Sequence, residues 1–113
     1  MDQNFAVATE ERAGIPVVRA FGEIDVASAP ILREQLEAAL EGGASTVIVD
    51  LLDVTFLDST GLGVLVGAMS GCQGRNGTLR LVVGERRILK VLEITGLRAV
   101  FPLFSTLEEA LAG

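Results

Sequence analysis

The run over residues 46–52, with the sequence TVIVDLL, constrains the fold of this chain more than any other feature. It is apolar except for Thr46 at its start and Asp50 in its middle. A strand with one face in water alternates apolar and polar residues, whereas a strand buried on both faces in a parallel sheet is continuously apolar. Parallel strands need crossover connections, which are usually helices. The run therefore predicts a buried strand in an α/β domain.

A hairpin and an amphipathic helix are predicted before this run. Residues 5–9 and 16–21 are rich in β-branched and aromatic residues and flank Ala13-Gly14, a pattern typical of a β-hairpin. Leucines then recur at four-residue spacing over 32–40 with charged residues on the opposite face, which predicts a helix that ends at Gly42-Gly43.

Strand and helix patterns continue to alternate after the run. We expect a turn over 53–58, a helix over 59–75, a strand over 79–83, a helix over 86–94, a strand over 99–104 and a final helix to Leu111. Pro102 in the last strand suits a sheet edge, and Ser105 and Glu108 form a capping box at the start of the final helix. Alternation implies right-handed crossovers and parallel pairing, while the hairpin adds an antiparallel part. The sequence therefore predicts one α/β domain over residues 1–113, with a mixed sheet of about five strands and about four helices.

Composition narrows the classes of function. Half of the 113 residues are hydrophobic, enough for one core without staples, and the single Cys72 lacks the spacing of a disulfide, zinc or redox site. We therefore expect no metal, no cofactor and a reducing, cytoplasmic location. The acidic N-terminus is unlike a secretory signal, and the apolar runs of about eight residues are too short to span a bilayer. The net charge of −6 argues against nucleic-acid binding, so we expect protein partners and no membrane insertion.

The most informative segment is 56–63, FLDSTGLG, which lies between the buried strand and a helix. Ser59 and Thr60 fall in the first helical turn, where unpaired N–H groups and the positive end of the macrodipole favour a negative group. A phosphate on Ser59 would add about −1.5 to −2 charge beside Asp58 and could repel a partner without unfolding the domain. Plain helix capping by the same three residues remains the alternative.

Two other features allow both a structural and a functional interpretation. Gly63, Gly67 and Gly71 recur on one side of the predicted helix, and each costs about 1 kcal/mol relative to alanine. They indicate either close packing or a shallow groove for a partner helix. Asp25 can cap the preceding helix, as Ser28 can, or contact a partner.

Enzymatic alternatives lack the residues that they need. The chain has no histidine, so a serine hydrolase would have to recruit Lys90, its one lysine, as the base. Neither a P-loop nor a dinucleotide-binding fingerprint is present, although flavin binding at the Ser/Thr-rich loop stays open. A receiver domain would use Asp50, Asp53 and Asp58, but the first strand supplies no acidic pair. We therefore expect no enzymatic activity.

Three motifs in order resemble those of the STAS-domain anti-sigma-factor antagonists. Residues 57–63, LDSTGLG, preceded by VIVDL at 47–51, are similar to the signature of that family. Residues 22–25, GEID, resemble its second motif, and ITGL at 94–97 resembles its helix-to-strand junction. The likeness covers nearly the whole chain and implies a STAS-like domain over 1–113.

The resemblance also implies a mechanism. An ATP-binding anti-sigma factor with serine-kinase activity would bind the unphosphorylated chain, release its sigma factor, and phosphorylate Ser59 to end the complex; a phosphatase would reverse this. The implied partner-binding residues are Asp25, Asp58, Ser59, Thr60, Gly61, Leu62 and Gly63. Thr60 is a second candidate acceptor. The alternative within the family is an accessory or scaffold subunit of a larger signalling assembly or a membrane transport complex.

Overall fold

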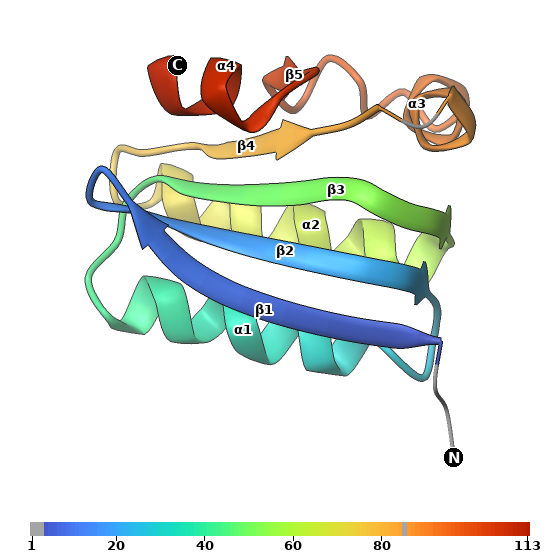
Figure 1. The fold of residues 1–113 in the computed structure, drawn as a ribbon, viewed down its shortest axis with the longest axis horizontal. Helices are drawn as coiled ribbons and strands as arrows, with labels where there is room; N and C mark the ends of the chain where they lie inside the picture. Colours follow the sequence, from blue (N-terminus) through green and yellow to red (C-terminus); the bar gives the residue numbers. More distant parts are fainter. Residues whose placement is uncertain (1–3, 85) are drawn as a thin grey trace.

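The computed structural model describes residues 4–84 and 86–113 (Figure 1). A five-stranded sheet has the order β1-β2-β3-β4-β5, in which β1 and β2 are antiparallel and the remaining neighbours are parallel. The strands are β1 (Phe5–Arg12), β2 (Ile15–Ile24), β3 (Val47–Leu57), β4 (Leu79–Val82) and β5 (Leu103–Phe104), and the helices are α1 (Ala29–Glu41), α2 (Ser59–Gln73), α3 (Arg86–Ile94) and α4 (Leu107–Ala112). The predicted α/β fold with a mixed sheet of five strands and four helices is confirmed.

Residues 47–51 of the apolar run form the first half of β3, the central strand, and are buried on both faces. On one face, Val47 and Val49 belong to the main core, to which α1 and α2 contribute. On the other face, Ile48 packs with Val17, Val82 and Ala110 of α4 in a smaller cluster. Figure 1 shows α1 and α2 behind the sheet, while α4 lies beside β4 and leaves the front of β1 and β2 uncovered.

The parallel strands bring their carboxyl ends to the same end of the molecule. The arrowheads of β2 and β3 lie there, together with α3 and the starts of α1 and α2 (Figure 1). Among the helices of the described residues, none has both the length and the apolar character needed to cross a membrane.

The expected turn over 53–58 is wrong, because β3 continues to Leu57. Asp53 and Thr55 are polar and exposed, but they belong to the second half of β3 and not to a turn. Two irregularities in the pairing of β2 with β3 allow the strand to run on. At one of them the Leu52 N–H donates to Asp50 Oδ1 over 3.0 Å, so a buried carboxylate stabilises the bulge.

The last strand is shorter than predicted. Residues 98–100 form a turn, in which the Val100 N–H donates to the Leu97 carbonyl over 2.9 Å. β5 lies at the edge of the sheet, as Pro102 indicated, and the Pro102 carbonyl accepts from the Leu81 N–H over 3.0 Å.

The capping box of α4 lies one residue later than predicted. Thr106, not Ser105, is the N-cap, and its hydroxyl accepts from the Glu109 N–H over 3.1 Å. The Glu109 carboxylate in turn accepts from the Ser105 N–H over 3.2 Å. Glu108 and Glu109 are both in the first turn, so the sequence alone allowed either register.

Candidate functional site

Asp58 caps α2 and leaves the Ser59 hydroxyl without a structural task. Asp58 Oδ1 accepts from the Thr60 N–H over 2.9 Å and from the Gly61 N–H over 3.1 Å. Its backbone is extended, as an N-cap requires. Ser59 is the first helical residue; its side chain is exposed, and its hydroxyl makes no hydrogen bond within the described residues. Helix capping therefore accounts for an aspartate at position 58 and does not account for a serine at position 59.

The next four residues of the motif differ in position. A Cβ on Gly61 would lie 2.6 Å from both Ile24 Cγ2 and Leu57 Cδ1, so this glycine allows α2 to approach the ends of β2 and β3. Leu62 is buried in the main core. Thr60 is half-buried and Gly63 is exposed. Of the residues implied as partner contacts, Gly61 and Leu62 thus lie inside the fold, and the others reach its surface.

Asp25 organises the loop between β2 and α1. Its Oδ1 accepts from the N–H groups of Ala27 and Ser28 over 3.0 and 3.1 Å, and these bonds, that of Ser28 foremost, hold the pKa of the Asp25 carboxyl below its usual value. The Ser28 hydroxyl donates to the Glu23 carbonyl over 2.8 Å and accepts from the Asp25 N–H over 2.9 Å. Ser28 is the N-cap residue but makes no side-chain cap bond. Asp25 is therefore a loop-stabilising residue, whatever else it contacts.

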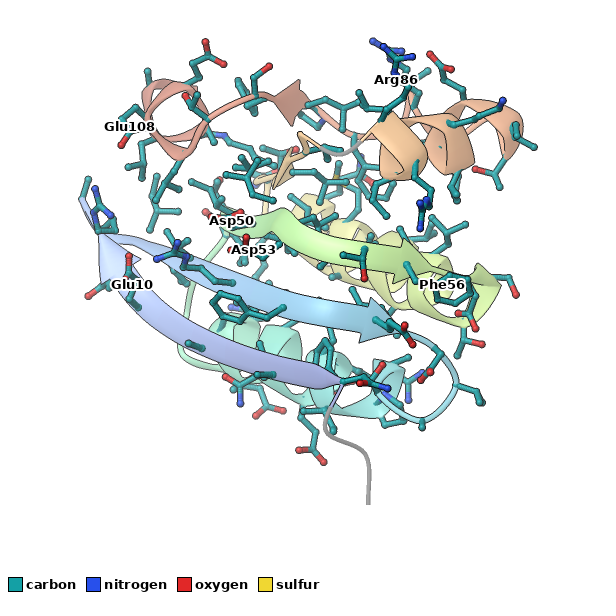
Figure 2. All side chains as sticks on the ribbon, turned by 45° about the vertical axis from the view of Figure 1, so that its right-hand side comes forward. Glu10, Asp50, Asp53, Phe56, Arg86 and Glu108 are labelled. Atoms are coloured by element: carbon teal, nitrogen blue, oxygen red, sulfur yellow. The ribbon has the colours of Figure 1, made fainter. Side chains whose placement is uncertain are left out.

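The loop between β2 and α1 lies beside the junction of β3 with α2. The Asp58 N–H donates to the Ile24 carbonyl over 3.2 Å, which joins the end of β2 to the start of α2. Val26 and Phe56 project from this end, with 73% and 44% of their surfaces exposed. Figure 2 shows Phe56 at the tip of β3, away from Asp50 and Asp53. The sequence analysis assigned neither residue a role of its own: Phe56 fell in the predicted turn over 53–58, and Val26 lies between residues 22–25 and the next predicted helix.

A groove of about 250 Å³ lies between α1 and α2, and Gly63 and Gly67 form part of its wall. A Cβ on either glycine would meet nothing within 4 Å, whereas a Cβ on Gly71 would lie 2.8 Å from Leu40 Cδ1. Close packing therefore accounts for Gly71 and does not account for Gly63 or Gly67. The other residues that line the groove are Arg33, Leu36, Glu37, Leu40, Val64 and Ala68.

The remaining reactive groups lie elsewhere. Cys72 is buried in the core, and burial raises the pKa of its thiol, which keeps it protonated and unreactive. Asp50 is buried and lies 3.4 Å from Arg19 Nε, measured from Oδ2. Within residues 4–84 and 86–113, no group of three or more His, Cys, Asp and Glu side chains is placed to hold a metal ion.

Comparison with known proteins shows the family of this chain. Residues 6–110 match the family model of the STAS domain. The chain is 44% identical over 82 residues to the anti-sigma-B factor antagonist of Bacillus subtilis (strain 168). The aligned residues cover 73% of this chain and 74% of that protein.

Solved structures have the same fold. An anti-sigma factor antagonist from Mycobacterium paratuberculosis superposes with a TM-score of 0.88 at 30% identity, covering 96% of this chain and 92% of that one. The Bacillus cell fate determinant SpoIIAA in its phosphorylated form has a TM-score of 0.74 at 28% identity, covering 95% and 97%. The chain therefore belongs to the STAS domain family.

Proposed function

We propose that this chain is an anti-sigma-factor antagonist that phosphorylation of Ser59 switches off. In its unphosphorylated form it binds an anti-sigma factor, which is an ATP-binding serine kinase, and so frees the sigma factor. A phosphatase that acts on phospho-Ser59 restores binding. The observation that carries this proposal is the exposed Ser59 hydroxyl at the start of α2, where Asp58 already does the capping.

The local geometry explains how a phosphate could change binding without changing the fold. The Asp58 carboxylate already accepts from two of the first N–H groups of α2. A phosphate on the adjacent Ser59 would bring about −1.5 to −2 charge beside that carboxylate. Like-charge repulsion would direct it outward, toward a docked partner. Asp25, Thr60 and Gly63 reach the surface at this end or beside it and complete the proposed contact area.

The relatives support the regulatory part of this proposal. Curated relatives from Bacillus, Listeria and Staphylococcus bear the name anti-sigma-B factor antagonist, and one structural neighbour was solved in a phosphorylated form. These proteins are regulators, so we assign no enzymatic activity to this chain. We place it in the cytoplasm, where RNA polymerase and its sigma factors act.

The test compares Ser59→Ala and Ser59→Asp as baits in pull-downs from source-cell extract, with the captured proteins identified by mass spectrometry. Ser59→Ala is expected to retain an ATP-binding kinase-like protein that Ser59→Asp loses. Ser70→Asp is the matched control, because Ser70 is also exposed on α2 but lies near its other end. Equal capture of the kinase by all three baits would refute the charge switch. Recovery of the same transporter subunits by every bait would instead favour the accessory-subunit role.

A further inference from the structure

α3 carries two cations in a row along its outer side. Ile88 and Leu92 are buried and fix the inner side of the helix. Arg86 and Lys90 lie one turn apart on the opposite side, and Ile94, 74% exposed, continues the same row. These three residues, Arg86, Lys90 and Ile94, are called the outer row below.

The outer row belongs to a cationic segment of an acidic protein. Residues 86–98 contain four of the nine Lys and Arg residues and one of the fifteen Asp and Glu residues, a net charge of +3 against −9 for the rest of the chain. That one acid, Glu93, forms an ion pair with Arg98. Neither Arg86 nor Lys90 forms an ion pair with an acidic side chain of the described residues.

This charge arrangement does not stabilise α3. Arg86 lies at the positive end of the helix macrodipole, and the first turn has no acidic residue. Arg86 and Lys90 are also like charges at the i, i+4 spacing, which is unfavourable. Local rules that a fold breaks without compensation are expected at functional sites.

The outer row lies at the same end of the molecule as Ser59. α3 follows β4 and contacts β3, and Figure 1 shows it beside the tip of β3. The Arg87 guanidinium donates to the Thr55 carbonyl over 3.4 Å, which places the start of α3 against the end of β3, just before the motif at 57–63. Figure 2 shows Phe56 at that tip and Arg86 pointing away from the strands. Glu23, Asp25 and Asp58 lie on the β2 and β3 side of this end, so its charge changes sign toward α3.

We propose that the outer row is a second contact for the anti-sigma factor and takes an acidic surface segment of it; this rests on the proposed function. An exposed Ile94 beside two cations suits a segment that mixes carboxylates with apolar side chains. A second copy of this chain is disfavoured as the occupant because its net charge of −6 opposes self-association. With negative and positive surfaces at one end, the partner can dock in only one orientation.

The test measures binding of the isolated partner kinase to the double variant Arg86→Glu/Lys90→Glu by surface plasmon resonance at several salt concentrations. We expect a loss of affinity of about tenfold or more at low salt, mainly in the association rate, that shrinks as salt rises. The control, Arg12→Glu/Arg75→Glu, makes the same charge change at exposed positions near the hairpin end and should bind within about twofold of wild type. Thermal melting separates a loss of binding from a loss of folding, and we expect the melting temperature to stay near that of wild type, because Arg86 and Lys90 are exposed and form no ion pair with an acidic side chain of the described residues.

Each other outcome decides between distinct claims. Unchanged binding of the double variant, with Ser59→Asp still inactive, would overturn this inference alone. Binding by Ser59→Asp at wild-type strength would overturn the proposed function itself. A defect seen only when the kinase holds a non-hydrolysable ATP analogue would show that the row meets nucleotide phosphates and not protein carboxylates. An oligomer of the wild type that the double variant disperses would assign the row to self-association.

Discussion

Asp58 and Ser59 are neighbours with different physical roles. Asp58 accepts two N–H hydrogen bonds at the start of α2, while the Ser59 hydroxyl makes none within the described residues. Removing a side-chain N-cap typically destabilises a protein by about 1 kcal/mol. We therefore expect Asp58→Ala to lower the free energy of unfolding by about 1 kcal/mol and Ser59→Ala to change it little, as measured by urea denaturation. Equal losses for both variants would show that Ser59 shares the cap.

Asp25 should make the domain sensitive to acid. Because hydrogen bonds to the carboxylate lower its pKa from the ordinary 3.8, the charged form stabilises the folded state above that value. The stabilisation is lost as the pH falls through the lower, folded-state pKa. We expect the stability advantage of wild type over Asp25→Asn to be constant at neutral pH and to shrink below pH 3.8, as measured by urea denaturation at each pH. An advantage of the same size at every pH, including below 3.8, would contradict this assignment.

At the scale of the element, the glycines of α2 separate into two kinds. Gly61→Ala forces a methyl group against Ile24 and Leu57, and we expect it to destabilise the domain by about 1–3 kcal/mol. The methyl group added by Gly67→Ala would meet nothing within 4 Å. This variant should stabilise α2 by about 1 kcal/mol, because glycine in a helix interior costs about that much relative to alanine. Chemical denaturation of both variants checks the contrast. A destabilising Gly67→Ala would mean that the groove is closed in solution.

The groove gives Gly67 a second test. Gly67→Leu should leave the fold intact, because there is space for a side chain, and would fill the groove between α1 and α2. If a partner helix docks there, this variant loses binding to the kinase while its melting temperature is maintained. Full binding by Gly67→Leu would restrict the partner contact to the end of the molecule around Ser59.

At the scale of the whole molecule, the proposed switch requires no change of shape. Since Asp58 keeps its cap bonds, a negative charge at position 59 leaves the core contacts of α2 in place. We expect the amide chemical shifts of Ser59→Asp to change only around the start of α2 and the adjoining β2–α1 loop. Shift changes across the sheet would instead indicate a global rearrangement and overturn the local mechanism.

The sequence by itself determined the elements and their order. The apolar run at 46–52, the leucine spacing of α1 and the turn residues Ala13-Gly14 reflect local periodicity and backbone preference, which act within a few residues. The place of the motif at 57–63 between a strand and a helix also followed from these local patterns. Periodicity does not distinguish polar residues of a turn from polar residues on the exposed positions of a strand. The continuation of β3 through Asp53 and Thr55 was therefore missed.

Only the tertiary structure decided the character of the site. Parallel strands bring Asp25, Asp58 and α3 to one end, although these residues are far apart in the chain. Hydrogen bonding then distinguished Asp58, which caps α2, from Ser59, which does not. Packing likewise distinguished Gly61 from Gly67. The physical reason is that burial and contact depend on neighbours supplied by distant segments, and local sequence preference does not specify those neighbours.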